Sequence, residues 1–247
     1  MDRMLYIAMG GAKETMLAQQ VNTHNLANVN TSGFRADIEA MQQKQVFGPG
    51  HADRVYALSQ DLKTMDFSKG ALESTGRELD IAVRGEGWIA IQAPDGNEAL
   101  TRRGDLKVTA AGLLMTSNDM PVMGNSGPIS LPPYEKLEIG QDGTISVRGI
   151  GQPANALAVI DRIKLVIPDN KTLEKDESGV VRIRNGDVAV ADASVQIVSG
   201  SLEKSNVNSV QSMVRMMELQ RHYELQVKMM DTARTNSQAT QELMRMK

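Results

Sequence analysis

The sequence predicts an α+β fold in which terminal α-helices form a discontinuous, coiled-coil-like stem around an inserted, mostly antiparallel β domain. Uneven residue distributions lead to this prediction. All eight prolines lie between residues 49 and 168, and 16 of the 21 glycines lie between residues 70 and 200. Twelve of the 16 methionines lie instead in residues 1–41 or after residue 201. Glycine and proline favour turns between strands, whereas methionine favours helices, so the ends are predicted to be helical and the middle to be strands.

The C-terminal helix is predicted over residues 205–247, which contain 43 residues without glycine or proline. At its full length such a helix measures about 60 Å. Apolar residues recur at steps of three and four, the spacing that places them on one face: Met213, Met216, Tyr223, Val227, Met230 and Met244. Polar residues fill the remaining positions of this stripe: Gln220, Arg234, Ser237 and Gln241. The stripe is therefore diluted, and the helix needs a partner along its length.

The N-terminal helix is predicted over residues 2–28, with a similar stripe of Leu5, Met9, Ala12, Met16, Gln19, Thr23 and Leu26. Gly10 and Gly11 either weaken this helix, by about 1 kcal/mol each, or allow another helix to approach closely. Because both stripes contain glutamine, they favour packing among several helices of neighbouring chains. The alternative is that both are ordinary core helices of one domain.

A turn is predicted where the first helix ends, in the segment Asn25-Leu-Ala-Asn-Val-Asn-Thr-Ser-Gly-Phe-Arg35. Asn28 and Asn30 are expected to adopt the left-handed conformation that caps helices, and Gly33 is expected to form a turn. Phe34 is expected to pack back on the helix end. Replacing Gly33 by valine should then misdirect the following connector while leaving the β domain folded.

The N-terminal stem helix and its Asn-rich turn are predicted over residues 1–34. The connector that follows spans residues 35–75 and has a mixed pattern. Residues 41–47 could extend a helix, residues 48–50 (Gly-Pro-Gly) would break it, and residues 55–58 have the composition of a short strand.

The inserted β domain is predicted over residues 76–199, followed by the C-terminal stem over residues 200–247. Short runs of β-branched and aliphatic residues predict strands at 78–83, 87–92, 106–109, 129–131, 137–139, 144–147, 156–166 and 180–183. Three dipeptides predict tight turns: Asp95-Gly96, Asp142-Gly143 and Asn185-Gly186.

Composition excludes several classes of function. The net charge is −3, from 27 basic and 30 acidic residues, and no long basic run is present, so binding of nucleic acid through its phosphates is not expected. No apolar run approaches 18 residues, so no membrane insertion is predicted. The absence of cysteine excludes disulfides, thiolate metal sites and cysteine nucleophiles. Residues 1–12 lack the apolar core and cleavage site of a secretory signal.

No catalytic, cofactor or metal site is predicted. Gly85-x-Gly87-x-x-Ala90 fits only the loosest dinucleotide fingerprint, because a strand and Pro94 follow it where a helix is required, and a hairpin around residues 84–87 is the preferred interpretation. The histidines, His24, His51 and His222, form no recognisable metal-ligand set and are interpreted as surface or interface residues. Arg102-Arg103 is interpreted as part of a solvated face.

Five separated motifs resemble the bacterial flagellar rod and hook axial proteins. The first is Asn25-Leu-Ala-Asn-x-x-Thr-x-Gly-Phe-Arg35. The second is Glu78-Leu-Asp-Ile-Ala-Val-Arg-Gly-Glu-Gly-Trp88, where the family has phenylalanine at the last position, and the third is Thr101-Arg-Arg-Gly-Asp-Leu106, where Leu106 replaces an aromatic residue. The last two are Asp142-Gly-Thr-Ile-Ser146 and Gly200-Ser-Leu-Glu-Lys-Ser-Asn-Val207. The spacing of Met217, Arg221, Tyr223 and Glu224 in the last helix also matches.

This resemblance implies a structural axial subunit of the flagellar basal-body rod that carries torque from motor to hook across the periplasm. It implies export by the flagellar type III apparatus without a cleaved signal peptide. The implied partners are that apparatus, copies of the chain itself, and other proximal and distal rod subunits. The length and the opening segment Leu5-Tyr-Ile-Ala-Met-Gly10 are most similar to proximal rod proteins, and the distal rod proteins are the alternative within the family.

Assembly residues are expected in the first motif and on the last helix: Asn25, Leu26, Asn28, Gly33, Phe34, Met213, Met216, Met217, Tyr223, Val227 and Met230. Two other classes stay open, an enzyme with a helical dimerisation stem and a secreted β binding module. An enzyme should have a pocket with perturbed ionisable groups, whereas a rod subunit should have a long helical stem with uncovered apolar faces.

Overall fold

The computed structural model describes residues 2–38, 41–46, 54–59, 64–153, 156–176, 179–184, 186 and 188–245. The chain divides into two compact units. The helical unit comprises Met1–Asn28, Asp37–Thr64 and Val207–Lys247, and the β unit comprises Val29–Ala36 and Met65–Asn206. The predicted fold class is confirmed, because the chain begins and ends with a helix and an antiparallel β region lies between them in the sequence.

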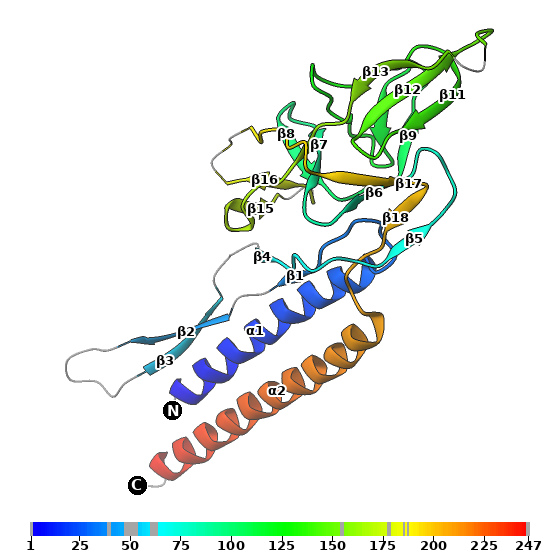
Figure 1. Ribbon diagram of the computed structural model, residues 1–247. Coiled ribbons are helices and arrows are strands. Elements are labelled where there is room, and N and C mark those ends of the chain that lie inside the picture. Colours follow the sequence, from blue (N-terminus) through cyan, green and yellow to red (C-terminus); the bar gives the residue numbers. More distant parts are fainter. Residues whose placement is uncertain are drawn as a thin grey trace. The chain divides into compact units, whose positions relative to one another are not determined.

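The helical unit contains α1 (Asp2–Ala27) and α2 (Ser209–Arg245), which lie side by side (Figure 1). They run in opposite directions, since Asn22 near the end of α1 donates from Nδ2 to the carbonyl of Ser212 at the start of α2, at 2.8 Å. Leu5, at the other end of α1, shares a groove with Met230 of α2. The two helices predicted from composition are therefore paired with each other.

Small and polar side chains form the buried positions of both helices, and this corrects the predicted stripes. On α1 the buried residues are Ala8, Ala12, Thr15, Ala18, Asn22 and Asn25. On α2 they are Ser212 and Ala233, with Met216, Leu219, Gln226 and Met230 half-buried. The predicted α1 stripe is displaced by one position over much of its length, since Met9 and Met16 are exposed. Small side chains allow the closest approach of two helices, as at Gly11, where an added Cβ would lie 2.9 Å from the amide of Gln226.

Asn28 terminates α1 with its side chain, not with a left-handed backbone. Its Nδ2 donates to the carbonyl of His24 at 3.0 Å, and its backbone N–H donates to the same carbonyl at 3.2 Å. Asp119 is the only non-glycine residue with a positive φ in the described part of the chain, so the left-handed caps predicted at Asn28 and Asn30 are wrong. The turn predicted at Gly33 is confirmed, with a φ of 65°.

The connector forms short strands: β1 (Asp37–Ile38), β2 (Met41–Val46), β3 (Arg54–Ser59) and β4 (Thr64–Met65). β2 and β3 pair in antiparallel register, with Met41 opposite Ser59 and Val46 opposite Arg54. The helix considered for residues 41–47 is therefore wrong, whereas the strand predicted at 55–58 lies within β3. Residues 47–50, including the predicted Gly-Pro-Gly break, and His51 lie outside the described residues.

The β unit is built from several small antiparallel sheets. Its largest sheet has the strand order β14-β7-β8-β16-β15, and a three-stranded sheet has the order β11-β12-β13. Three further strand pairs are β5–β18, β6–β17 and β9–β10. The bounds are β5 (Leu72–Ser74), β6 (Ile81–Arg84), β7 (Trp88–Gln92), β8 (Glu98–Thr101), β9 (Leu106–Val108), β10 (Leu114–Thr116), β11 (Tyr134–Ile139), β12 (Thr144–Gly149), β13 (Ala158–Arg162), β14 (Leu165–Val166), β15 (Leu173–Lys175), β16 (Val181–Ile183), β17 (Gln196–Ser199) and β18 (Ser201–Glu203), with a 3₁₀ turn at Asn170–Thr172.

Strand β7 is buried on both faces and joins the two apolar clusters of the β unit. Side chains alternate between the faces of a strand, so Ile89 and Ile91 enter the larger cluster, while Trp88 and Ala90 enter the smaller one. Ile81, Leu106 and Ile145 are fully buried members of the larger cluster. The residues of β7 therefore read as a continuous apolar run because neither face is open to water.

Two of the predicted tight turns are confirmed: Gly96 between β7 and β8 and Gly143 between β11 and β12 have φ values of 84° and 86°. Beside the first turn, Arg182 Nη1 lies 2.6 Å from Asp95 Oδ2, and this hydrogen bond holds the pKa of the Asp95 carboxyl well below its usual range. The hairpin predicted at residues 84–87 is wrong, because β6 pairs with β17 and β7 pairs with β8 and β14. Asn185 lies outside the described residues.

Some strands differ from the prediction. Residues 129–131 form only an isolated bridge between Ser130 and Leu113. Strands β5, β8, β10, β15, β17 and β18 were not predicted. Their partners are distant in sequence or their apolar runs are short, so the local pattern is weak.

Candidate assembly surface and buried ion cluster

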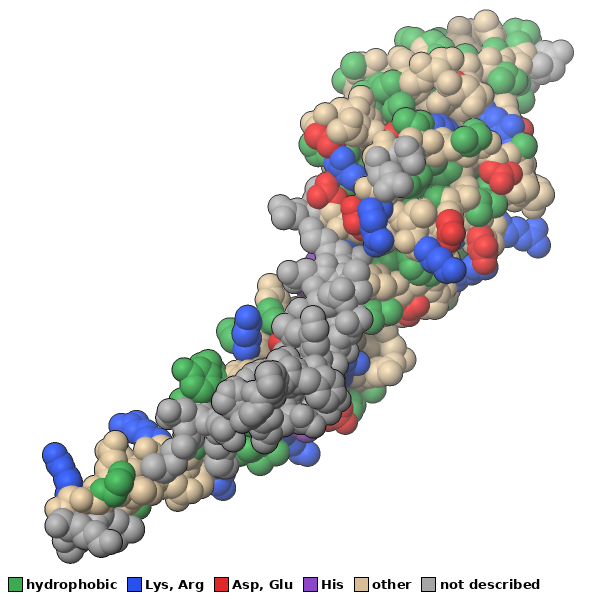
Figure 2. All heavy atoms as spheres, turned by 90° about the vertical axis from the view of Figure 1, so that its left-hand side faces the viewer, with side chains coloured by type: hydrophobic (Ala, Val, Ile, Leu, Met, Phe, Trp, Pro, Cys, Tyr) green, Lys and Arg blue, Asp and Glu red, His purple; other side chains and the backbone are tan. Residues whose placement is uncertain are grey.

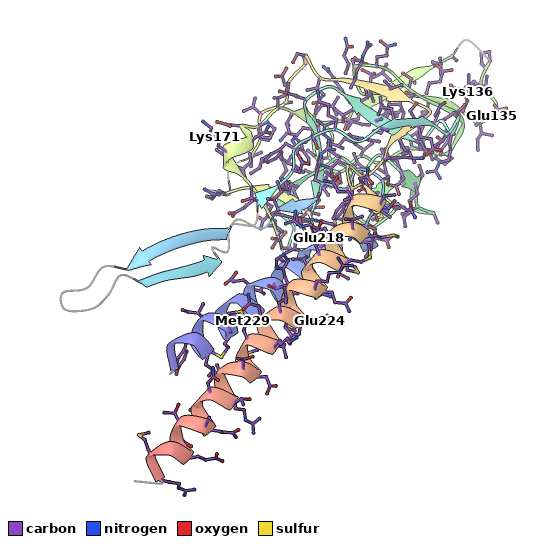
Figure 3. All side chains as sticks on the ribbon, turned by 90° about the horizontal axis from the view of Figure 1, so that it is seen from below. Glu135, Lys136, Lys171, Glu218, Glu224 and Met229 are labelled. Atoms are coloured by element: carbon purple, nitrogen blue, oxygen red, sulfur yellow. The ribbon has the colours of Figure 1, made fainter. Side chains whose placement is uncertain are left out.

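Large apolar side chains face outwards on both helices of the helical unit. On α1 the exposed residues are Leu5, Tyr6, Ile7, Met9 and Met16. On α2 they are Val210, Met213, Val214, Met217, Tyr223, Leu225, Val227, Met229 and Met244. Figure 3 shows how Glu218, Glu224 and Met229 project from α2. Single exposed apolar residues are ordinary, but so many on one pair of helices are typical of an interaction surface.

The residues predicted on α2 fall into two groups. Met213 and Met217 are both 54% exposed, and Tyr223 and Val227 are also exposed, so these four belong to the outward surface. Met216 and Met230 are half-buried. Val227 and Met230 line a groove of about 450 Å³, together with Leu5 of α1. Their role in assembly stays a prediction.

Asn25 and its neighbours in the first motif act within the helical unit. The Asn25 side chain is buried, where Nδ2 donates to the Asp37 carbonyl at 2.9 Å and Oδ1 accepts from the Asp37 N–H at 2.8 Å. His24 Nδ1 lies 2.7 Å from Asp37 Oδ2. Leu26 and Asn28 are half-buried. The Asn25 amide therefore makes with Asp37 of β1 the same pair of hydrogen bonds that the backbone of a neighbouring strand would make.

Gly33 and Phe34 belong to the β unit. The Gly33 N–H donates to the carbonyl of Glu203 at 2.7 Å, and a Cβ added at Gly33 would lie 2.3 Å from the carbonyl carbon of Arg102. Glycine is needed there both for its positive φ and for this close approach. Phe34 is half-buried, with Lys175 Nζ 4.4 Å from the centre of its ring. Its predicted packing against the helix end stays a prediction.

Three charged side chains far apart in sequence form a buried cluster in the β unit. Arg35 Nη2 lies 2.7 Å from Glu203 Oε1, and Arg102 Nη1 lies 3.1 Å from Glu203 Oε2. The Gly70 N–H donates to Glu203 Oε1 at 3.0 Å. All three charged residues are at most 5% exposed. The cluster therefore links three of the five sequence motifs: Arg35 belongs to the first, Arg102 to the third and Glu203 to the last.

Arg102 was interpreted as a solvated residue, and the structure shows that this is wrong. Its Nη2 donates to the carbonyl of Gly85 at 2.9 Å, and its guanidinium lies 5.5 Å from the centre of the Trp88 ring. Burial lowers the pKa of the Arg102 guanidinium, and the Glu203 carboxylate opposes that effect. The neighbouring Arg103 agrees better with the predicted solvated face, because it is partly exposed. Its Nε lies 2.8 Å from Asp105 Oδ1.

The side chain of Asn206 connects separate segments of the β unit by hydrogen bonds. Its Oδ1 accepts from the Ala36 N–H at 2.8 Å, and its Nδ2 donates to the carbonyls of Asp66 and Ser68 at 3.0 and 3.1 Å. Sequence reasoning missed the roles of Arg35, Glu203 and Asn206. The available signal was that all three lie within the quoted motifs, but the pairing between those motifs is not visible in a single sequence.

On the face shown in Figure 2, basic and acidic side chains are intermingled over the β unit, as on an ordinary solvated surface. Among the described residues, there is no group of three or more His, Cys, Asp or Glu side chains placed to hold a metal ion. No helix in the described part of the chain is long and apolar enough to cross a membrane.

Three family descriptions match separate parts of the chain. They are flagella basal body rod protein (residues 5–35), flagellar hook protein FlgE/F/G D1 domain (residues 82–147) and flagellar basal body rod FlgEFG protein C-terminal (residues 198–243). The flagellar basal-body rod protein FlgF of Salmonella typhimurium is 36% identical over 252 residues, covering 100% of both chains. The chain belongs to the flagellar basal-body rod proteins. It is FlgF-like.

Other relatives agree with this assignment. FlgF of Escherichia coli is also 36% identical, with 100% of both chains covered. A FlgG rod protein of Buchnera aphidicola is 28% identical, with 93% of this chain and 95% of the relative covered. The rod family accounts for both ends of the molecule, since the matched segments include most of α1 and most of α2. The chain is thus a structural rod subunit of the flagellar basal body.

Proposed function

We propose that this rod subunit assembles through its helical unit, packing against copies of itself and against other rod subunits. The observation that carries this proposal is the outward apolar surface of α1 and α2, including Met213, Met217 and Val227. Identical chains that pack head to tail close into rings or extend helically, which is the geometry an axial structure requires.

The energetics of this surface favour assembly. Complete burial of a methionine, leucine or valine side chain stabilises by about 1.5–3 kcal/mol, and these residues are roughly half exposed, so each would contribute roughly half of that amount. Association costs about 4–15 kcal/mol in lost translational and rotational freedom. Several such side chains are therefore needed together, and the two helices present them together.

We further propose the proximal rod as the place of this subunit, spanning part of the periplasm and transmitting torque from motor to hook. The support is the 36% identity to the FlgF proteins of Salmonella typhimurium and Escherichia coli along the whole chain, whereas the FlgG relatives, like one FlgF of Buchnera aphidicola, are 28% identical. Export through the flagellar type III apparatus without a cleaved signal peptide belongs to the same proposal. The distal rod is the alternative, because the chain is also similar to FlgG rod proteins.

A non-enzymatic role is part of the proposal, in keeping with a structural family. Two carboxyl groups in the β unit besides Asp95 have lowered pKa values, and both have local structural causes. Hydrogen bonds from Thr144 lower the pKa of Asp142, and hydrogen bonds from Ser194 lower the pKa of Asp192. Both groups are Asx-type turn formers, which is a structural use of a carboxylate.

The test introduces a charge into the outward surface. Met217→Asp removes apolar contact and would place a carboxylate in a packed interface, whereas Gln152→Asp introduces the same charge at an exposed polar position of the β unit. Met217→Asp should lower the melting temperature of the free subunit only slightly, because about half of the side chain is exposed there, and it should permit export and abolish rod assembly and swimming. Gln152→Asp should affect assembly much less. Normal basal bodies with Met217→Asp would contradict the proposal.

Tyr223→Asp provides a second variant in the same assay. Tyr223 is 39% exposed, so most of its ring is already covered within the free subunit. We therefore expect this variant to lower monomer stability by about 1 kcal/mol as well as to impair assembly. Comparison with Met217→Asp separates the two effects.

A further inference from the structure

The buried ion cluster lies beside a pocket of about 440 Å³ in the β unit. Arg35 and Arg102 both line this pocket, with Trp88 and Phe67 as apolar walls and Lys69 as a further cation. Trp88 is buried, and Lys69 is exposed. The pocket therefore combines a cationic interior with an aromatic lining.

The cluster carries more positive charge than its own residues neutralise. Two buried guanidinium groups share the single carboxylate of Glu203. Arg35 Nε, Arg35 Nη1 and Arg102 Nε are buried and have no hydrogen-bond partner in the described part of the chain. Leaving a buried ionic donor unpaired costs several kcal/mol, so native proteins usually supply a partner for it.

We propose that this pocket is a binding site for a carboxylate group. A guanidinium matches a carboxylate in geometry and charge, and one carboxylate would balance the surplus charge of the two arginines against Glu203. The aromatic walls at Trp88 and Phe67 suit the methylene groups of an acidic side chain.

The other charges of the pocket narrow the ligand class. Glu86 and Asp169 also line it, and both are exposed. Their repulsion is screened by water but increases with the charge of the ligand. A dianion such as phosphate is therefore disfavoured relative to a singly charged carboxylate. In a rod, the source of that carboxylate is a glutamate or aspartate of a neighbouring subunit, and this part of the inference rests on the proposed function.

Trp88 provides the assay, because it is the only tryptophan in the chain and forms a wall of the pocket. The full-length subunit is titrated at low ionic strength with a capped peptide containing one glutamate, with the matching glutamine peptide, with acetate and with inorganic phosphate. The glutamate peptide should change the fluorescence saturably, and the glutamine peptide should not. Acetate binding as tightly as the peptide would support the site but identify a small free carboxylate as its ligand.

Two rim variants should shift the affinity in opposite directions without touching the buried cluster. Lys69→Glu should weaken binding of the glutamate peptide about fivefold, and Glu86→Gln should strengthen it about twofold, as expected for exposed charges. Lys136→Glu and Glu135→Gln make the same changes in net charge on β11, and Figure 3 shows both residues far from Lys171, which follows the pocket residue Asn170 in the sequence. These controls should leave the affinity unchanged.

Equal responses to the glutamate and glutamine peptides, a response to phosphate alone, or equal effects of the rim and control variants would each overturn the inference. The measurement uses the free subunit, so a failure of rod assembly in cells would not affect its outcome. Conversely, an absent fluorescence response would leave the assembly surface on α1 and α2 unaffected.

Discussion

Replacement of Gly33 by alanine should destabilise the β unit by about 2–5 kcal/mol. Gly33 has a φ of 65°, and an alanine in that conformation costs about 1–2 kcal/mol. Its Cβ would also lie 2.3 Å from the Arg102 carbonyl carbon and 2.5 Å from the Arg103 nitrogen. Because these are backbone atoms, they cannot rotate away, and overpacking of this kind costs about 1–3 kcal/mol more. The prediction that valine at position 33 leaves the β domain folded is therefore replaced by the prediction that it destabilises the β unit.

Gly76 provides the matched control, because its φ is 72° and, apart from its chain neighbours, no described residue has an atom within 4 Å of a Cβ added there. Gly76→Ala should cost only the conformational term, about 1–2 kcal/mol. Urea unfolding of both variants, followed by the fluorescence of Trp88 in the β unit, measures the difference between them. Equal losses of stability would show that the approach of Gly33 to Arg102 has no energetic consequence, and would refute the reasoning.

Three further perturbations have defined outcomes. In the same urea assay, Arg102→Met should cost about 1–3 kcal/mol, because Glu203 Oε2 and the carbonyl of Gly85 each lose a hydrogen bond while Arg35 still pairs with Glu203, whereas Arg103→Met should cost less than about 1 kcal/mol; equal costs would contradict the burial argument. The carboxyl of Asp95 has a lowered folded-state pKa, so it stabilises the fold above about pH 4 and loses that effect as the pH falls. Asp95→Asn should therefore be less stable than the parent at pH 7 and lose less stability on acidification, and an unchanged pH profile would contradict this. Gly10→Ala, at an exposed helical position where no described residue beyond its own helical turn has an atom within 4 Å of an added Cβ, should raise helix stability by about 0.5–1 kcal/mol in thermal circular dichroism, and a lower melting temperature would contradict it.

The terminal helices and the Asp-Gly turns could be predicted because their signals are local. Helix propensity depends on composition within a few turns, and a positive φ after Asp95 or Asp142 requires glycine at the next position. The hairpin at residues 84–87 failed because strand pairing is not local. β6 pairs with β17, more than a hundred residues later, and nothing in the four residues of the turn indicates that partner.

The buried face of α1 could not be chosen from periodicity, because two adjacent stripes both contain apolar residues. Ala8 and Ala12 are buried, while Met9 and Met16 remain exposed. A hydrophobic pattern weights methionine above alanine, whereas close helix packing within one chain favours the smaller residue. The larger residues are the ones expected in a surface that becomes buried only on assembly.

Arg102 illustrates a different limit. A pair of adjacent arginines is most often solvated, and its local sequence contains no sign of burial. The compensating carboxylate of Glu203 lies 101 positions away, so the charge balance appears only in three dimensions. The exposed apolar residues of α2 could be named from the sequence, and their role in assembly stays a prediction, whereas the ion cluster and its pocket could not be named.

The hydrogen bonds of Asn206 bear on how such a subunit can change in evolution. They close a loop of 170 sequence positions at Ala36 and a loop of 140 positions at Asp66, using one side-chain amide. The separation between the ends of the insertion is thus fixed by residues at its base, independently of what lies between them. Doubling the length of such a loop costs only about 0.6 kcal/mol in closure entropy. Lengthening or shortening the outer strands would therefore change the entropic cost of closing this insertion only slightly.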